Sequence, residues 1–391
     1  MNKEPTIISS LSIKLLKTIG SPFQPTTERL EEGNESLELY DHAIKNKMPL
    51  LYLESLKQQG KLNKLNSKYE KEHVRYLKFL NGVAKVSEVL NAADLEFLIF
   101  KTIKPFPAVH GDADIIILGD EDMYKQAVEA LLKAGYVHQL SDLVDVKMLT
   151  SEEEYKKAVE ILVKPTHGGG KYGLKHVSPT GTDFVDPEWK LDIDLQKDLA
   201  LSYVVYMDKN NFRGYITETE LLNGAKIKVP TPELDMAIVI AHSLAEQMYL
   251  LGECYTLLYR LSEMDTERIG NFMNILRENK LTMAAKSFVT VTAVLCKEAY
   301  GEVPDKIEEL RDELGYEESE AKRLVKSGFK VPHRYGGRTL IKVFFEKMKE
   351  KRFRRSVGTQ MAKMLNPRLT RLMIKSLIEL RKREYYLKSV E

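Results

Sequence analysis

Two aspartates separated by one residue, Asp112 and Asp114, are the side chains of this sequence best suited to chemistry. They open the run DADIIIL (112–118), whose β-branched residues predict a strand. Residues two apart on a strand point to the same face, so the two carboxylates converge. Carboxylates packed together repel each other and lose solvation, so such a pair usually implies a cation. Mg²⁺ fits, because it prefers oxygen ligands and is commonly held by one or two carboxylates and substrate phosphates.

A competing interpretation is that GDAD (111–114) is only a polar turn before a strand, since Gly and Asp are ordinary turn formers. The preceding apolar run LEFLIF (95–100) favours a site, because it leads directly into Lys101 and Thr102. A cation and a hydroxyl at the end of a strand can hold a triphosphate.

The loop between the two predicted strands adds further charge. Lys104 lies in the segment KPFPAVHG (104–111), whose two prolines restrict the loop and reduce the entropy lost on ordering. His110 stands beside the two acids and is expected either to contact phosphate or to be a solvated loop histidine.

A third acid is expected from the segment KLDIDLQ (190–196), which alternates apolar and polar residues as a half-buried strand does. Asp192 and Asp194 point to one face of that strand and are candidate metal ligands. A two-metal phosphoryl-transfer site needs such a group to position the attacking hydroxyl.

These residues resemble the nucleotidyltransferase superfamily of DNA polymerase β, and most closely its uncharacterised nucleotidyltransferase families. The resemblance covers about residues 40–260 and is most specific over 97–118. It implies an α+β fold in which a small mixed sheet with helices is flanked by N-terminal and C-terminal helical regions. It also implies that Asp112 and Asp114 bind Mg²⁺ and that Asp194 is the third acid, with Asp192 in reserve.

The sequence departs from the pattern of the better-known members at two places. Lys101 and Thr102 stand where those members have Gly and Ser, so Lys101 is expected to approach phosphate by charge. Gln196 stands where the related strand often has histidine.

The pattern along the chain predicts three regions. Residues 1–92 and 229–391 show apolar residues at helical spacing, and residues 93–228 combine strands and helices and are expected to form the nucleotidyltransferase core. The loop HGGGKYG (167–173) lacks P-loop spacing and is expected to be a surface loop rather than a substrate lid. Asn366 and Pro367 are a good start for a last helix.

The composition and the distribution of apolar and charged residues limit the classes of protein to which this chain can belong. No apolar run is long enough for a bilayer span and no secretory leader is evident at the start, so a cytoplasmic protein is expected. Cys254 and Cys296 fall in helical patterns and are expected to be buried thiols, not a disulfide or a metal site. Residues 331–391 hold 17 Lys plus Arg against 5 Asp plus Glu, a candidate surface for a polyanion.

The sequence therefore predicts a Mg²⁺-dependent nucleotidyltransferase that moves a nucleoside monophosphate from an NTP to a hydroxyl of RNA, tRNA or a protein. Small-molecule acceptors remain a variant of this class. The alternative is a non-catalytic module that keeps the fold and binds nucleic acid or a partner protein through its basic C-terminal helices.

Overall fold

The computed structural model describes residues 10–23, 35–109, 111–138, 181–186, 188–201, 204–315 and 333–365, with residues 331, 367, 370, 371 and 374. It is a mixture of helices and small sheets, which confirms the predicted α+β class. His110, the loop HGGGKYG (167–173) and most of the predicted last helix lie outside the described residues.

In space the chain forms two compact units, each assembled from distant segments. Unit 1 contains residues 1–76, 104–109 and 232–347, and unit 2 contains residues 77–103, 110–231 and 348–391. The long helix α4 (Asn66–Ala92) contributes its first turns to unit 1 and the rest to unit 2. The three expected regions, divided near 92 and 228, stay a prediction.

Unit 1 is built from helices whose apolar faces share a core. Its helices are α1 (Ser10–Ile19), α2 (Glu35–Lys45), α3 (Pro49–Gln58), α7 (Pro232–Ala245), α8 (Leu251–Glu263), α9 (Thr266–Glu278), α10 (Thr282–Tyr300), α11 (Asp305–Glu313) and α13 (Gly337–Lys347), with the short helix η1 (Asn63–Leu65). Helix α7 is buried on nearly all sides, as its continuous apolar sequence predicts. Cys254 and Cys296 are buried free thiols, as expected. The two-residue strands β10 (Met248–Tyr249) and β11 (His333–Arg334), which the helical pattern did not indicate, pair antiparallel.

The central sheet of unit 2 has the strand order β1-β2-β5-β4-β3. Its strands are β1 (Phe97–Ile99), β2 (Asp112–Ile117), β3 (Val137–His138), β4 (Gly181–Val185) and β5 (Asp192–Gln196). Strands β2 and β5 are parallel, and the other neighbours are antiparallel. Strand β2 is apolar on both faces beyond its two aspartates, so it is a central strand whose other side chains fill the core.

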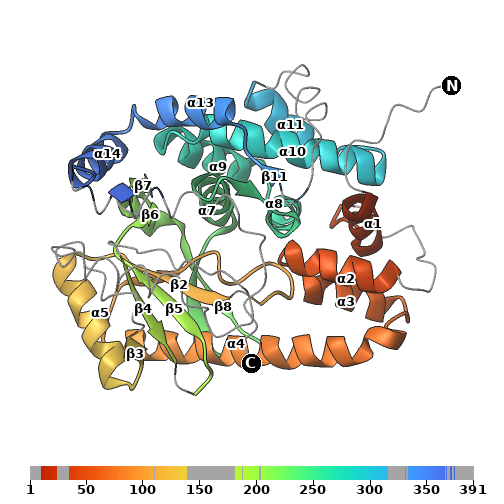
Figure 1. The fold of residues 1–391 in the computed structure, drawn as a ribbon, viewed down its shortest axis with the longest axis horizontal. Coiled ribbons are helices and arrows are strands. Elements are labelled where there is room, and N and C mark those ends of the chain that lie inside the picture. The colour runs from red at the N-terminus through yellow and green to blue at the C-terminus, as the bar shows by residue number, and fades with distance from the viewer. Residues whose placement is uncertain are drawn as a thin grey trace. The chain divides into compact units, whose positions relative to one another are not determined.

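Two helices pack against this sheet. Helix α5 (Glu121–Lys133) lies beside β3 and β4 in Figure 1. It begins at the N-cap Asp120, whose carboxylate accepts hydrogen bonds from the amides of Asp122 and Met123, and Gly135 follows its end with φ of 89°. On α4, Gly82 lies against Leu191 just before β5, where an added Cβ would stand 2.9 Å from the Leu191 Cδ2 atom.

The other described parts of unit 2 include two hairpins, two short helices and a basic helix. These are β6 (Leu199–Leu201) with β7 (Val204–Met207), β8 (Ile216–Glu220) with β9 (Lys226–Pro230), η4 (Lys209–Asn211), η5 (Arg213–Tyr215) and α14 (Lys351–Lys363). Arg352 of α14 contacts the carboxylates of Asp198 and Asp208, and Ser356 Oγ accepts a hydrogen bond from the Val205 amide at 3.1 Å. These contacts join α14 to the β6–β7 hairpin.

Across the described residues, no helix has both the length and the apolar character that a bilayer span requires.

Candidate functional site

The sheet register brings the two predicted acid pairs together. Asp112 of β2 is paired with Asp192 of β5, and Asp114 is paired with Asp194. Directly opposed residues of neighbouring strands have side chains on the same face, so four carboxylates share one face of two adjacent strands. The sequence predicted each pair, and the parallel pairing of β2 with β5 places them side by side.

Asp114 is the most buried member of this set. Asp114 is 2% exposed, and the Lys101 Nζ atom lies 2.9 Å from the Asp114 Oδ1 atom. Asp112, Asp192 and Asp194 are half-buried. Lys101 thus places a positive charge among the acids even though it follows a different strand, β1, in sequence.

Lys101 has an unusual backbone conformation at the end of β1. Its φ is 46°, in the left-handed region that favours glycine and costs other residues about 1 kcal/mol or more. Strain of this kind persists where surrounding contacts hold it, and the ion pair with Asp114 is such a contact. The backbone of Lys101 therefore has a conformation that glycine adopts more readily than lysine does.

Thr102 is fully buried and its hydroxyl is engaged with the backbone. The Oγ1 atom donates to the Phe100 carbonyl at 2.9 Å and accepts from the Asp114 amide at 2.9 Å. These bonds fix the backbone of Asp114 against the end of β1. The observed contribution of Thr102 is to position Asp114, and its predicted contact with a triphosphate stays a prediction.

The predicted contacts of two other residues, Lys104 and His110, with a nucleotide stay predictions. Lys104 belongs to the segment 104–109 of unit 1, where Phe106 packs against Tyr255 and Tyr259. Burial raises the pKa of Glu253 in that unit to about 7, opposed first by the charge of Lys47 and more weakly by that of Lys104. His110 lies outside the described residues, so its predicted role stays a prediction.

Asp194 carries the clearest electrostatic signal. Its pKa is raised well above the ordinary value of an aspartate, first by burial, then by the carboxylate of Asp183 and that of Asp114, while Lys101 lowers it. Gln196 Nε2 donates to Asp194 Oδ2 at 2.6 Å. Grouped acids whose pKa values are displaced by burial and by each other are typical of functional sites.

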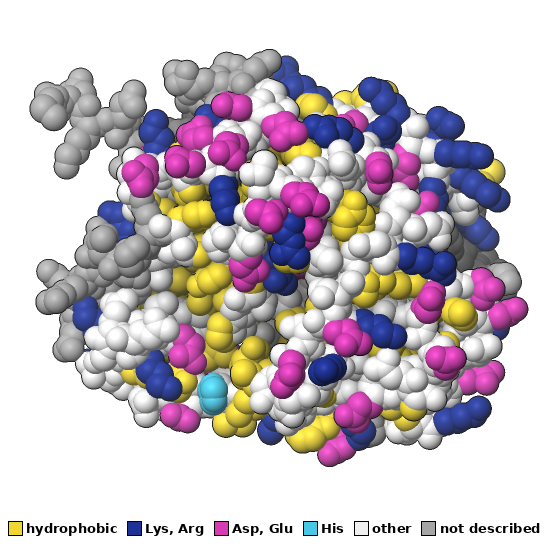
Figure 2. Space-filling view, turned by 180° about the vertical axis from the view of Figure 1, so that it is seen from behind, with side chains coloured by type: hydrophobic (Ala, Val, Ile, Leu, Met, Phe, Trp, Pro, Cys, Tyr) yellow, Lys and Arg dark blue, Asp and Glu magenta, His cyan; other side chains and the backbone are white. Residues whose placement is uncertain are grey.

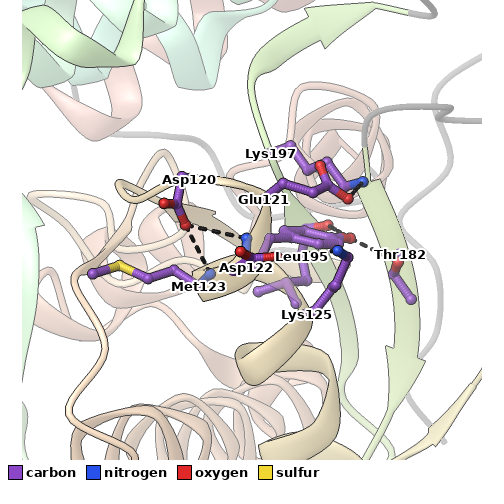
Figure 3. A network of polar contacts seen from close by, with 9 residues as sticks. Asp120, Glu121, Asp122, Met123, Lys125, Thr182, Leu195 and Lys197 are labelled. Carbon is purple, nitrogen blue, oxygen red and sulfur yellow. Dashed lines mark hydrogen bonds and ion pairs between the residues drawn. The ribbon is translucent and has the colours of Figure 1, made fainter.

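Helix α5 holds the two strands that carry Asp183 and Asp194. Tyr124 Oη donates to Thr182 Oγ1 at 2.7 Å and to the Leu195 carbonyl at 3.1 Å, so one hydroxyl joins the helix to β4 and β5. Lys197 forms an ion pair with Glu121 at 2.6 Å (Figure 3). Its Nζ atom also lies over the Tyr124 ring, 4.6 Å from the ring centroid. At the other end of β2, Lys209 Nζ donates to the carbonyls of Ile117 and Gly119.

Asp183 is the acid that sequence reasoning missed. It occupies the middle of β4 and is paired with Asp194. Its only signal in the sequence is a polar position in the short run GTDFV (181–185), and nothing local shows which residue of β5 it opposes.

The candidate ligands suit a hard divalent cation, although they do not form a complete coordination sphere in their present positions. All candidate ligands are oxygen atoms, the set that Mg²⁺, Mn²⁺ and Ca²⁺ prefer. No three His, Cys, Asp or Glu side chains among the described residues already stand at metal-ligating geometry. Because Lys101 engages Asp114 and Gln196 engages Asp194, these side chains would have to shift to hold an ion.

No protein-family model matches this chain, and no curated protein is significantly similar to it. The resemblance to nucleotidyltransferases therefore stands on the residues and the register described above.

Proposed function

We propose that this protein is a Mg²⁺-dependent nucleotidyltransferase of the polymerase β type. It would transfer a nucleoside monophosphate from an NTP to a hydroxyl of RNA, tRNA or a protein. The observation that carries the proposal is the pairing of Asp112 with Asp192 and of Asp114 with Asp194 on neighbouring parallel strands. The glycine-like φ of Lys101, at the position of the family's glycine, supports it.

The charge balance of this face also supports the proposal. Asp112, Asp114, Asp183, Asp192 and Asp194 share one face of the sheet, and Lys101 forms an ion pair with Asp114 there. Carboxylates in this number repel one another unless positive charge is supplied. Mg²⁺, held by Asp112, Asp114 and Asp194, would supply that charge together with Lewis acidity toward the phosphates and the acceptor hydroxyl.

In the proposed reaction, the acceptor oxygen attacks the α-phosphorus and the bond from that phosphorus to the bridging oxygen of the β-phosphate breaks. Pyrophosphate leaves with the electron pair of that bond. Asp194, as the third acid, would help a second metal ion to activate the acceptor hydroxyl. Lys101, released from Asp114, would contact the triphosphate, and Thr102 would hold the Asp114 backbone in place.

Labelled nucleotides test this proposal directly. The full chain is incubated with Mg²⁺, each α-labelled NTP and separate RNA and protein acceptor pools. Asp114→Ala is expected to lower label transfer by about 1,000-fold or more, because it removes a ligand that acts on the developing charge. Asp94→Asn is the matched control, since Asp94 is exposed in the same unit and its φ of 54° suits asparagine. Transfer that is equal in wild type and Asp114→Ala, or absent with every nucleotide and acceptor, would overturn the proposal.

The alternative function, a non-catalytic nucleic-acid-binding module, is favoured by the surface of α14. Its buried side carries Phe353 and Ser356, and its exposed side carries Lys351, Arg354 and Arg355. Figure 2 shows Lys and Arg side chains gathered along the edge of the molecule where α14 lies. Such a surface suits the phosphates of a nucleic acid.

RNA-binding measurements at several salt concentrations separate the two functions. The module predicts salt-sensitive binding that survives Asp112→Ala with Asp114→Ala and is weakened by Arg354→Gln with Arg355→Gln. The matched control neutralises two exposed lysines of α5, Lys125 and Lys133, in the same unit. Retained RNA binding without any NTP affinity would favour the module, and absence of RNA binding would exclude it.

A further inference from the structure

The pairing of β4 with β5 adds an acid to the site on the side away from β2. Asp183 opposes Asp194 in the antiparallel register, and Asp194 opposes Asp114 in the parallel one. Opposed residues project to the same face, so Asp114, Asp194 and Asp183 form one row across three neighbouring strands. Asp183 is half-buried, within reach of solvent and of an entering ion.

Two buried oxygen atoms beside this row point to a missing cation. The Asp194 Oδ1 atom and the Gln196 Oε1 atom are both shielded from solvent and have no hydrogen-bond partner among the described residues. Gln196 is 6% exposed, and its amide lies at the row because its Nε2 atom donates to Asp194. Buried acceptors without a donor are rare in native proteins, so a positive ligand at this place would account for both.

The arrangement also carries an electrostatic cost in the absence of a ligand. The carboxylates of Asp183 and Asp194 belong to directly opposed residues of the antiparallel strands β4 and β5. Like charges directly opposite each other on neighbouring strands are destabilising. A cation between Asp183 and Asp194 would remove this repulsion.

We propose that Asp183 and Asp194, with the amide oxygen of Gln196, bind a hard divalent cation at a subsite distinct from that of Asp112 and Asp114. Carboxylate and amide oxygens select Mg²⁺ or Mn²⁺ over Zn²⁺. The ligands come from the protein alone, so the subsite fills without a nucleotide. The inference shares Asp194 with the proposed transfer reaction and rests on that function for its biological role, but ion binding requires no turnover.

Counting bound Mn²⁺ by electron paramagnetic resonance in nucleotide-free solution tests the subsite. Asp183→Asn is expected to bind about one Mn²⁺ per chain fewer than wild type, or to bind it about 10- to 100-fold more weakly. Asp183→Glu keeps a carboxylate and is expected to restore much of the loss. Asp94→Asn removes an exposed carboxylate of the same unit and is expected to bind Mn²⁺ as wild type does.

Thermal unfolding provides a second measurement that also checks folding. Asp183→Asn relieves the repulsion on Asp194, so it is expected to be at least as stable as wild type without metal and to gain less stability when Mg²⁺ is added. Equal Mn²⁺ counts and equal Mg²⁺-dependent stabilisation in wild type and Asp183→Asn would overturn the subsite. An Asp183→Asn variant that fails to fold in metal-free buffer would overturn it as well, because Asp183 would then be a structural residue.

The two proposals fail in distinguishable ways. If Asp183→Asn binds one ion fewer but the wild-type protein transfers no nucleotide, the subsite is supported and the proposed function is rejected. If Asp183→Asn binds Mn²⁺ as wild type does and the wild-type protein transfers nucleotides, the proposed function is supported and the subsite is rejected.

Discussion

Two aspartates, Asp235 of unit 1 and Asp194 of unit 2, have different surroundings. In unit 1, Asp235 is 1% exposed and Arg260 meets it with two nitrogen atoms, each at 2.9 Å. Tyr255, also fully buried there, donates to the Gly20 carbonyl at 2.7 Å. In unit 2, Asp194 instead lies between two other aspartates.

This difference separates structural from functional burial. A buried charge that meets an opposite charge or a carbonyl is satisfied by the fold itself. The Asp194 Oδ1 atom, by contrast, is shielded from solvent and has no hydrogen-bond partner among the described residues. Ionisable groups in such surroundings are more often part of functional sites than of the structural framework.

The same chemical change in each unit gives the largest expected difference. Asp235→Asn removes the buried countercharge of Arg260 and leaves it only the more exposed Glu263 at 3.5 Å, so we expect a loss of about 3 kcal/mol in the free energy of unfolding. Asp194→Asn removes a repelled carboxylate, so we expect metal-free stability to be unchanged or higher. Chemical denaturation of both variants in chelator-treated buffer measures the difference. Equal destabilisation by the two substitutions would break the comparison.

A smaller expected effect is a loss of stability at low pH, which concerns a histidine of unit 1. Burial, and then the charge of Lys45, lowers the pKa of His42 to about 4, and its Nε2 atom lies 2.9 Å from Ser12 Oγ. The folded state keeps this ring neutral, whereas the unfolded chain takes up a proton below about pH 6.5. The contribution of His42 to stability is therefore complete above about pH 6.5 and declines as the pH falls toward 4, by about 2 kcal/mol after allowance for partial exposure.

Unfolding curves between pH 7 and pH 4 measure this loss. His42→Gln is expected to lose less stability than wild type over the same range, because glutamine does not titrate. Asp94→Asn serves as the control and is expected to follow wild type. Parallel curves for wild type and His42→Gln would remove His42 as the cause.

The smallest effect concerns the support of the acid row. Tyr124→Phe removes a hydroxyl that joins α5 to β4 and β5, so we expect a loss of about 1 kcal/mol in the free energy of unfolding. Because Leu195 adjoins Asp194, weaker Mn²⁺ binding is expected to accompany that loss. Lys125→Gln, which affects only an exposed ion pair on the same helix, is expected to change stability by less than about 0.5 kcal/mol. A Tyr124→Phe protein that is as stable as wild type would show that the hydroxyl bonds are not needed.

Local patterns in the sequence determined the elements that carry the site. The β-branched run after Asp112 and Asp114 predicted β2, and the alternation around Asp192 and Asp194 predicted β5. Helical spacing likewise predicted most of the helices of unit 1. Strand and helix periodicity reflects which face of an element is buried, and a single sequence records that directly.

Only the tertiary structure decided which of these residues meet. The pairing of β2 with β5, across a long stretch of intervening chain, aligned the acid pairs, and the pairing of β5 with β4 placed Asp183 in the row. The tertiary structure also brought Lys101, which follows β1, to the carboxylate of Asp114 on β2. A shift of one residue in register would turn every side chain of a strand to the opposite face, and that register depends on packing between distant segments, which no local pattern encodes.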